Sequence, residues 1–373
     1  MSLRILESGR HLAPVRAAAN ELGIPASTGG DDWEVLWSYR TPWSADALKA
    51  RAATRARRRT LVNHMPGTLR IASKAHLPQL ARAAGLGAAI PTSFNLPEDS
   101  AAAWRAVSAQ GVGDGAGFPV WLLKSKQHRG VRALLNASAA GLNASEPAIV
   151  QRRVRPLLLR GLPHAFDIGL YVLVASVRPL RVYAYERALV RFCEAPFPRD
   201  PATFVARPSS FVINHYTPIW ELPFFASALR ACESSAVCAL RRELSAQGHD
   251  ADELWHSMQR IAGSLLRALE PHIATGLQHV RLHEREVFEL FRFDFLVDET
   301  ARPVLTEVNL SPNLVAAHVE DGRVKAALLR DTLRIVTRQP RAAAPDKALL
   351  GGFVPIELPP EPPTTSANMK GDL

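Results

Sequence analysis

Hydrophobic and polar positions alternate along two neighbouring stretches near residue 300, and this pattern predicts a β-hairpin. The first stretch, Phe288–Val297, is rich in aromatic and β-branched residues, and its phenylalanines share one face. The second stretch, Val304–Leu310, alternates again and is expected to place Leu305, Glu307 and Asn309 on one side. The segment between them is polar and ends in proline, which suits a short connection.

The expected register of this hairpin predicts a site for a divalent cation. If the turn is symmetrical about Thr300 and Ala301, Asp294 lies opposite Glu307, with Cβ atoms roughly 4.5–5.5 Å apart. Two facing carboxylates among apolar neighbours are unfavourable unless a cation joins them. With the amide oxygen of Asn309 they would form an oxygen cup suited to Mg²⁺. The alternative is a surface hairpin whose charges face solvent.

A second hairpin is predicted over residues 166–186, with its turn at residues 177–179. Its first strand places Asp167 and Gly169 on one face. Arg181 and Arg191 lie in apolar surroundings in and after this hairpin. Each could pair with a carboxylate of the fold or bind a ligand, and the pattern does not decide between these roles.

The clearest helical pattern spans Asp250–Glu270. Asp250 is expected to cap this helix, Glu253 to reach back to the cap, and Pro271 to end it. Its buried stripe is predicted to comprise Leu254, Met258, Ile261, Leu265 and Leu269. These apolar positions indicate a core and no chemistry.

The apolar segment 120–124 predicts a strand that ends in a lysine. Lys124 could reach out to solvent or hold a phosphate. The basic turn that follows, residues 125–131, contains a glycine and could fold over an anion, which favours the phosphate role. The glycine-rich segment 111–117 lacks the spacing of a phosphate-binding loop and is interpreted as a linker.

Charge and length limit the class of protein. The 373 residues suffice for two or three lobes, and 47% hydrophobic content is ordinary for a globular protein. With 45 Lys and Arg against 35 Asp and Glu the formal net charge is +10. This charge suits an acidic partner, although abundant solvated arginine explains it equally well. The sequence contains no stacking or groove-reading motif, so we expect no nucleic-acid binding.

Cysteine content and hydropathy predict where the protein works. Cys193, Cys232 and Cys238 form no CxxC pair, and we expect reduced thiols in an intracellular protein. No apolar run approaches the roughly 20 residues that span a bilayer, and the first residues lack a signal-peptide core. The prediction is a soluble cytoplasmic protein that does not bind membranes.

Several of these segments, in this order, resemble the tubulin–tyrosine-ligase-like family of ATP-grasp enzymes. The resemblance covers roughly residues 32–338. It is carried by VNHMPG at 62–67, WLLK at 121–124, HRG at 128–130, PLLLRGLPHAFDIGLYVLVASVRPLRVYAYERALVRF at 156–192, HYT at 215–217 and FELFRFDFLVDETARPVLTEVNLSPNL at 288–314.

The resemblance implies an α/β (α+β) fold of the ATP-grasp type. A small N-terminal α/β lobe is expected at residues 1–72 and a central lobe at 73–150. A C-terminal lobe with the metal site is expected at 151–338, and the last two lobes would enclose ATP. The proline-rich residues 339–373 are predicted to be a disordered tail.

The resemblance also implies roles for individual residues. The nucleotide would be bound by Lys124, Arg129, Gly130, Val131, Gln151, Arg152, Arg153, Val154 and Asp167. One or two Mg²⁺ ions would be held by Asp294, Glu307 and Asn309. Catalysis is assigned to Arg181, Arg191 and Glu307, and contact with the substrate to Lys74 and Thr217.

Members of this family use ATP to phosphorylate a carboxylate, and an amino acid then attacks the acylphosphate to form an amide. The resemblance therefore implies a ligase that adds glutamate to tubulin, at its acidic C-terminal tails. Such an enzyme would act as a monomer in the cytoplasm, associated with the cytoskeleton or with a cilium or flagellum.

Two positions depart from the family pattern. Family members read Lys-Phe-Asp-Leu/Ile-Arg where this chain reads Ala165-Phe-Asp-Ile-Gly169. The missing lysine would touch ATP, and the missing arginine would stand near the γ-phosphate and the reacting carboxylate. Two alternatives follow: an ATP-grasp ligase with a non-tubulin substrate, and a nucleotide-binding pseudoenzyme that serves as a microtubule adaptor. The complete set of Asp294, Glu307 and Asn309 favours a ligase.

Overall fold

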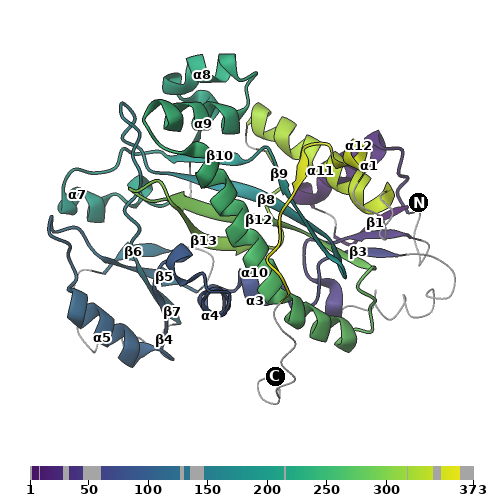
Figure 1. Ribbon diagram of the computed structural model, residues 1–373, viewed down its shortest axis with the longest axis horizontal. Helices are drawn as coiled ribbons and strands as arrows, with labels where there is room; N and C mark the ends of the chain where they lie inside the picture. Colours follow the sequence, from purple (N-terminus) through teal and green to yellow (C-terminus); the bar gives the residue numbers. More distant parts are fainter. Residues whose placement is uncertain are drawn as a thin grey trace.

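The computed structural model describes residues 2–7, 9–27, 33–44, 60–126, 130–134, 147–213, 216–316, 318–338 and 346–361. They form two β-sheets with helices packed around them, as Figure 1 shows, which confirms the mixed α/β class. The basic run 51–59 lies outside the described residues.

The larger sheet has ten strands in the order β1-β2-β3-β12-β8-β10-β11, with β13 on β12, β9 on β8 and β14 on β9. Their bounds are β1 Leu3–Ile5, β2 Val35–Trp37, β3 Leu61–Asn63, β8 Phe166–Val177, β9 Leu180–Tyr185, β10 Leu189–Cys193, β11 Tyr216–Pro218, β12 Val287–Val297, β13 Pro303–Asn309 and β14 Phe353–Pro355. Strand β12 is central: it runs parallel to β3 and antiparallel to β8 and β13. Strands β1, β2 and β3, which lie within the expected N-terminal lobe, extend this sheet.

The smaller sheet has the order β4-β7-β5-β6, and all its neighbours are antiparallel. Its strands are β4 Ser93–Leu96, β5 Trp121–Ser125, β6 Val131–Ala133 and β7 Ala148–Arg152, and helix α5 Ser100–Gln110 packs on it. In Figure 1 this unit lies at the lower left, beside the larger sheet. It falls within the predicted central lobe except for the end of β7.

Helices cover both faces of the larger sheet. One face carries α4 Leu77–Ala83, α8 Ala226–Ala231, α9 Ala236–Ala246 and the long α10 Ala251–His279. The other face carries α1 Ala13–Glu21 and α11 Val319–Arg338. The remaining helices are α3 Leu69–Ala72, α7 Pro201–Ala206 and α12 Lys347–Leu350. The sheet is therefore the buried middle layer of the molecule.

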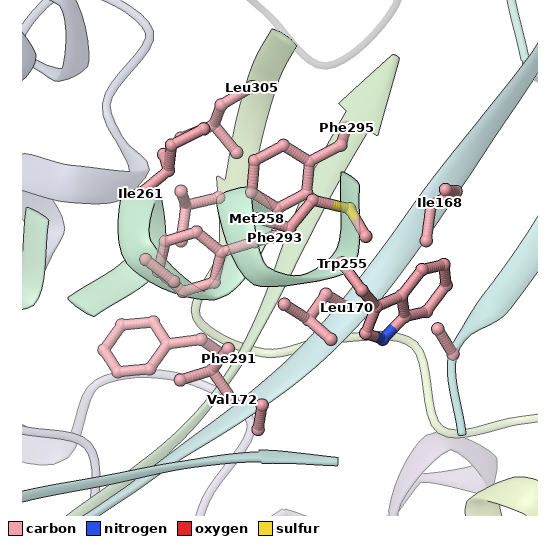
Figure 2. Close-up of a cluster of buried hydrophobic side chains, with 14 of the residues drawn as sticks. Ile168, Leu170, Val172, Trp255, Met258, Ile261, Phe291, Phe293, Phe295 and Leu305 are labelled. Atoms are coloured by element: carbon pink, nitrogen blue, oxygen red, sulfur yellow. The ribbon is translucent and has the colours of Figure 1, made fainter. Parts of the chain in front are cut away.

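The predicted phenylalanine face of β12 packs against α10. Figure 2 shows Phe291, Phe293 and Phe295 beside Met258 and Ile261, and all five side chains are buried. Because side chains alternate along a strand, Arg292 and Asp294 must emerge on the opposite face. The hydrophobic contact with α10 thereby determines which face carries the charged residues.

The long helix differs from its prediction in two respects. Asp250 caps it through its Oδ1, which accepts from the Glu253 backbone N–H at 2.9 Å, but Glu253 bonds to Ser257 and Arg260 instead of reaching back. The helix also continues through Pro271 to His279, so the predicted end was wrong. Buried apolar residues beyond the proline maintain the contact with the core and offset the lost backbone hydrogen bond.

The β12–β13 hairpin contains a β-bulge that the symmetrical register did not predict. Near the turn Val297 pairs with Pro303, so the turn is centred on Thr300 alone. Between Leu305 and Glu307 one extra residue, Thr306, interrupts the ladder, and its Oγ1 donates to the Asp294 carbonyl at 2.9 Å. The bulge places Glu307 opposite Asp294, as predicted.

The same bulge corrects the expected faces of β13. Leu305 is buried with the phenylalanine face, whereas Glu307 and Asn309 lie on the face of Asp294. The prediction that Leu305 shares the side of Glu307 and Asn309 was wrong, because an added residue changes the alternation of side chains.

Two further expectations were wrong. Cys232 and Cys238 form a disulfide between α8 and α9, and only Cys193 is a free thiol. In the predicted disordered tail, residues 346–361 are ordered: α12 contacts α11, and β14 adds a strand to the edge of β9. Residues 339–345 and 362–373 lie outside the described residues. Among the described helices, none has the length and hydropathy required to cross a bilayer.

Candidate active site

A cavity of about 240 Å³ lies between the two sheets. It is lined by most of the residues that the sequence nominated: Lys74, Lys124, Gly130, Val131, Gln151, Arg152, Arg153, Val154, Asp167, Arg191, Asp294 and Glu307. Apolar side chains complete the wall, among them Leu122, Ile149 and Leu296. The cavity thus combines apolar walls with a few convergent charged groups, as ligand-binding pockets do.

Lys124 projects from β5 into this cavity. Burial lowers the pKa of its ammonium group to about 8; Glu307 raises this pKa, and Lys74 lowers it. Lys124 of the smaller sheet and Glu307 of β13 in the larger sheet line the same cavity, so the two walls carry opposite charges at this point. An ammonium group with a lowered pKa becomes fully charged when an anion such as a phosphate binds beside it.

Residues 151–154, which are predicted to bind the nucleotide, form the end of β7 and the segment that follows it. Gln151 donates from Nε2 to Ser93 Oγ at 2.9 Å, which ties β7 to β4. Arg153 donates to the Pro119 carbonyl at 2.7 Å and to Asp114 Oδ2 at 2.8 Å. These bonds hold the side chain of Arg153 against the linker 111–117, while the segment as a whole lines the cavity.

Four neighbouring strands of the larger sheet carry a row of charged residues toward the cavity. The register places Arg191 of β10 opposite Asp167 of β8, and Asp294 of β12 between Gly169 and Glu307. Arg191 forms two hydrogen bonds to Asp167, at 2.8 and 2.6 Å, and an ion pair with Asp294 at 3.1 Å. Arg191 therefore joins the two carboxylates across the sheet.

Arg292 belongs to the same row, and our sequence reasoning missed it. Its Nε and Nη2 donate to the two carboxylate oxygens of Asp294 at 2.6 and 2.7 Å, and the side chain is buried. A signal was available in the sequence. The alternation that directs the phenylalanines of β12 to one face directs Arg292 and Asp294 to the other.

These contacts give the two buried aspartates different pKa values. Burial alone would raise the pKa of Asp294, but the charges of Arg292 and Arg191 hold it well below its ordinary value. Burial raises the pKa of Asp167 to about 6; Arg191 opposes this rise and the negative charge of Asp294 adds to it. At neutral pH Asp294 is thus firmly ionised. Both of its carboxylate oxygens already accept hydrogen bonds from Arg292, so a cation bound there would share them with arginine.

The three residues nominated as metal ligands lie together. Asn309 Nδ2 is 3.2 Å from Asp294 Oδ2 and 3.3 Å from Glu307 Oε1. Their donors are hard oxygens, two carboxylates and an amide, and this set fits Mg²⁺ that keeps waters and binds phosphate oxygens. No group of three or more His, Cys, Asp or Glu side chains in the described ranges is arranged as a metal site, so such an ion depends on Asn309 and the nucleotide for further ligands.

Three nominated residues are not gathered at this site. Arg181 of β9 pairs with Ser176 of β8, and Ser176 lies nine residues along β8 from Asp167, which is on the order of 30 Å. Thr217 pairs with Phe192, so it lies on the sheet face opposite Arg191. Arg129 lies outside the described residues.

The VNHMPG segment positions the start of β12. His64 has a positive φ of 78° and its Nδ1 lies 2.6 Å from Glu289 Oε1. The other oxygen of Glu289 accepts from the Met65 backbone N–H at 2.7 Å and from Thr68 Oγ1 at 3.2 Å. All of these groups are buried, so this network joins β12 firmly to the N-terminal segment.

The chain matches known proteins over most of its length. The sequence model described as "Tubulin-tyrosine ligase family" matches residues 52–345. The chain is 28% identical over 326 residues to "Probable tubulin polyglutamylase ttll-15" of Caenorhabditis elegans, which covers 86% of this chain and 59% of that protein. It is 27% identical over 323 residues to the human "Tubulin monoglutamylase TTLL4" and 28% identical over 314 residues to the human "Tubulin polyglutamylase TTLL5".

The last two alignments cover 83% and 80% of this chain but 25% and 23% of those proteins. The chain thus spans less than two thirds of the length of these relatives. The family match covers most of the chain, and the mixed α/β architecture is consistent with the ATP-grasp-like fold of that family. This chain belongs to the tubulin-tyrosine ligase family.

Proposed function

We propose that this chain is an ATP-dependent carboxylate–amine ligase that adds glutamate to the acidic tails of tubulin. One observation carries the proposal: a single cavity joins Lys124 of the smaller sheet to the Asp294–Glu307 pair of the larger sheet. The relatives named as tubulin glutamylases and the formal net charge of +10, which suits an acidic protein substrate, support the choice of substrate.

The reaction would proceed in two balanced steps. A carboxylate oxygen of tubulin attacks the γ-phosphorus of ATP, and ADP leaves. The amine of glutamate then attacks the acyl carbon, inorganic phosphate leaves, and the nitrogen loses a proton to give the amide. Each step develops negative charge on oxygen atoms, which fixed cations in a low-dielectric site stabilise.

The residues of the cavity would divide these tasks. Lys124 would hold the phosphates, and Arg191 would face the transferred phosphoryl group from the opposite wall. Asp294, Glu307 and Asn309 would hold Mg²⁺, which when bound would neutralise charge on the phosphates. The apolar wall of the cavity would exclude water and so limit hydrolysis of the acylphosphate.

A second candidate is a ligase that keeps this chemistry and uses a different acidic acceptor. Ala165 and Gly169 favour it, because both positions lack the cations of the family pattern. Both are at the site: Ala165 lines the cavity, and Gly169 pairs with Asp294.

Both candidates are tested with the full chain, ATP, Mg²⁺, tubulin and each radiolabelled amino acid in turn. We expect glutamate to label tubulin and the Glu307→Gln variant to lose this activity. Glu299→Gln is the matched control, because Glu299 lies in the same hairpin but is exposed and pairs with Arg155. Label on other acidic proteins but not tubulin would support the second candidate, and ATP binding without turnover on any acceptor would exclude both.

A further inference from the structure

The space beside Gly169 is occupied by another residue. A Cβ atom added at Gly169 would lie 3.0 Å from Arg292 Cδ, 3.4 Å from Arg292 Nε and 3.3 Å from Asp294 Oδ1. The contacts with Arg292 Cδ and Asp294 Oδ1 are both tighter than ordinary van der Waals packing, and the one with Arg292 Cδ is the tighter of the two. The side chain of Arg292 therefore fills the volume that a larger residue at position 169 would need.

The register explains how Arg292 reaches this position. Arg292 of β12 pairs with Tyr171 of β8, and the next pair on the same face is Asp294 with Gly169. Diagonal neighbours across two strands are separated by roughly 7–8 Å, which a long side chain spans. Because Gly169 has no side chain, Arg292 can extend along the sheet to Asp294, where it forms its two hydrogen bonds.

Arg292 places a buried positive charge beside the cavity. Its side chain is 10% exposed, and its charge is buried between β8 and β13. A buried ion pair is often no more stabilising than apolar residues of similar volume. Asp294 already has a second cation, Arg191, at 3.1 Å. Arg191 is itself bound to Asp167, so the two arginines and the two aspartates form one buried cluster, in which Arg292 adds a second positive charge beside the cavity-lining Asp294.

We propose that Arg292 supplies, from β12, the guanidinium that the family pattern places at position 169 of β8. The inference rests on the proposed ligase function. The positive charge at the reaction centre has moved to the adjacent strand, so Gly169 is no sign of an inactive enzyme. Arg292 does not itself line the cavity, whereas Asp294, to which it is bound, does; Arg292 therefore acts as a positioning residue whose charge, through Asp294, helps to stabilise the transferred phosphoryl group and the reacting carboxylate.

The proposal predicts that a guanidinium returned from position 292 to position 169 restores activity. Arg292→Gly removes the guanidinium and should lower kcat by about 10²–10³-fold, the effect of losing one such donor. The exchange variant Gly169→Arg/Arg292→Gly should recover kcat to within about tenfold of the unaltered chain, because it restores the charge beside Asp294 without crowding. The matched control Gly169→Met/Arg292→Gly fills the same volume without charge and should stay as slow as Arg292→Gly.

Three measurements separate chemistry from folding: kcat and KM on tubulin, MgATP affinity from a fluorescent analogue, and the melting temperature. Arg292→Lys provides a second, milder variant that keeps the charge but not the two parallel hydrogen bonds, and we expect it to retain intermediate activity. A loss of kcat with KM for tubulin changed less than about threefold, in protein that stays folded at the assay temperature, supports the proposal.

The outcomes also distinguish this inference from the proposed function. If the unaltered chain labels tubulin but the methionine control is as active as the arginine exchange, the inference is wrong and the ligase proposal stands. If the unaltered chain labels nothing, the ligase proposal fails. The MgATP affinities of the two exchange variants then test whether the guanidinium of Arg292 acts at the nucleotide site. In that case equal affinities for the charged and uncharged exchange variants overturn the inference.

Discussion

Asp294 lies directly opposite Glu307 because Thr306 bulges out of strand β13. Without the extra residue the register set by the turn would pair Asp294 with Thr306. A bulge adds one residue to a strand and re-aims the side chains that follow it. Here it brings two carboxylates and Asn309 onto one face, next to the cavity.

This arrangement predicts that the affinity of the protein for ATP depends on a divalent cation. Chelation with EDTA should weaken ATP affinity at least tenfold, because phosphates and carboxylates then repel one another. In Asp294→Asn and Glu307→Gln the difference between the Mg²⁺ and EDTA titrations should shrink. A fluorescent ATP analogue measures both affinities, and an equal Mg²⁺ effect in Glu307→Gln would count against the proposed ligands.

The resemblance assigned both Arg191 and Arg181 to catalysis, but only Arg191 lines the cavity. Arg191 joins Asp167 and Asp294, so Arg191→Lys should reduce kcat by about 10-fold or more through loss of its parallel hydrogen bonds. Arg181→Lys is the matched control, and it should leave kcat unchanged because Arg181 lies at the other end of β8. Steady-state ligation assays on both variants decide the matter, and equal effects would contradict this assignment.

Lys124 predicts the pH dependence of nucleotide binding. Burial lowers the pKa of its ammonium group to about 8, so below pH 8 the group is charged before ATP arrives. Above pH 8 binding must first take up a proton, and ATP affinity should fall by up to tenfold per pH unit. Affinity measured from pH 7 to pH 9.5 tests this. In Lys124→Arg the decline should be much shallower, since arginine remains charged throughout.

The buried His64–Glu289 pair predicts a pH dependence of stability. Burial alone would lower the pKa of His64, but the charge of Glu289 raises it above the ordinary value of 6.5. A raised folded-state pKa means that the pair stabilises the fold fully below about pH 6.5, and this contribution is lost as pH rises through the folded-state pKa. The stability difference between the unaltered chain and His64→Gln should therefore be largest in mild acid.

Chemical denaturation at several pH values measures that difference. Breaking a buried pair by removing one partner costs about 3–5 kcal/mol, and a loss of this size is expected for Glu289→Ala. His76→Gln is the control, because His76 is exposed and its ring bonds only to Ser73 among the described residues. A difference for His64→Gln that grows toward alkaline pH would contradict the assigned charge state.

Much of the fold and site followed from local sequence patterns. The alternation in β12 predicted its buried phenylalanine face, and hydrophobic spacing predicted the stripe of α10, because burial of apolar surface acts on every third or fourth residue of a helix and every second residue of a strand. The Asp294–Glu307 pair was also predicted, although from a turn centre that differs by half a residue.

Other features depended on groups that are distant in sequence. The end of α10 was mispredicted because contacts with the core outweigh the local effect of Pro271. The ordered segment 346–361 was missed because β14 pairs with β9, more than 160 residues earlier in the chain. The Cys232–Cys238 disulfide was missed because no local spacing rule indicated it.

The sequence by itself determined which residue types face the core and which carry chemistry: the carboxylates of β12 and β13, the lysine of β5 and the glycine at position 169. Only the tertiary structure decided which of them meet. Strand order brings Arg191 to the site and leaves Arg181 away from it, and the missing side chain of Gly169 lets Arg292 extend to Asp294. The physical reason is that periodicity is a property of neighbours along the chain, whereas strand pairing and the filling of space are properties of neighbours across the sheet.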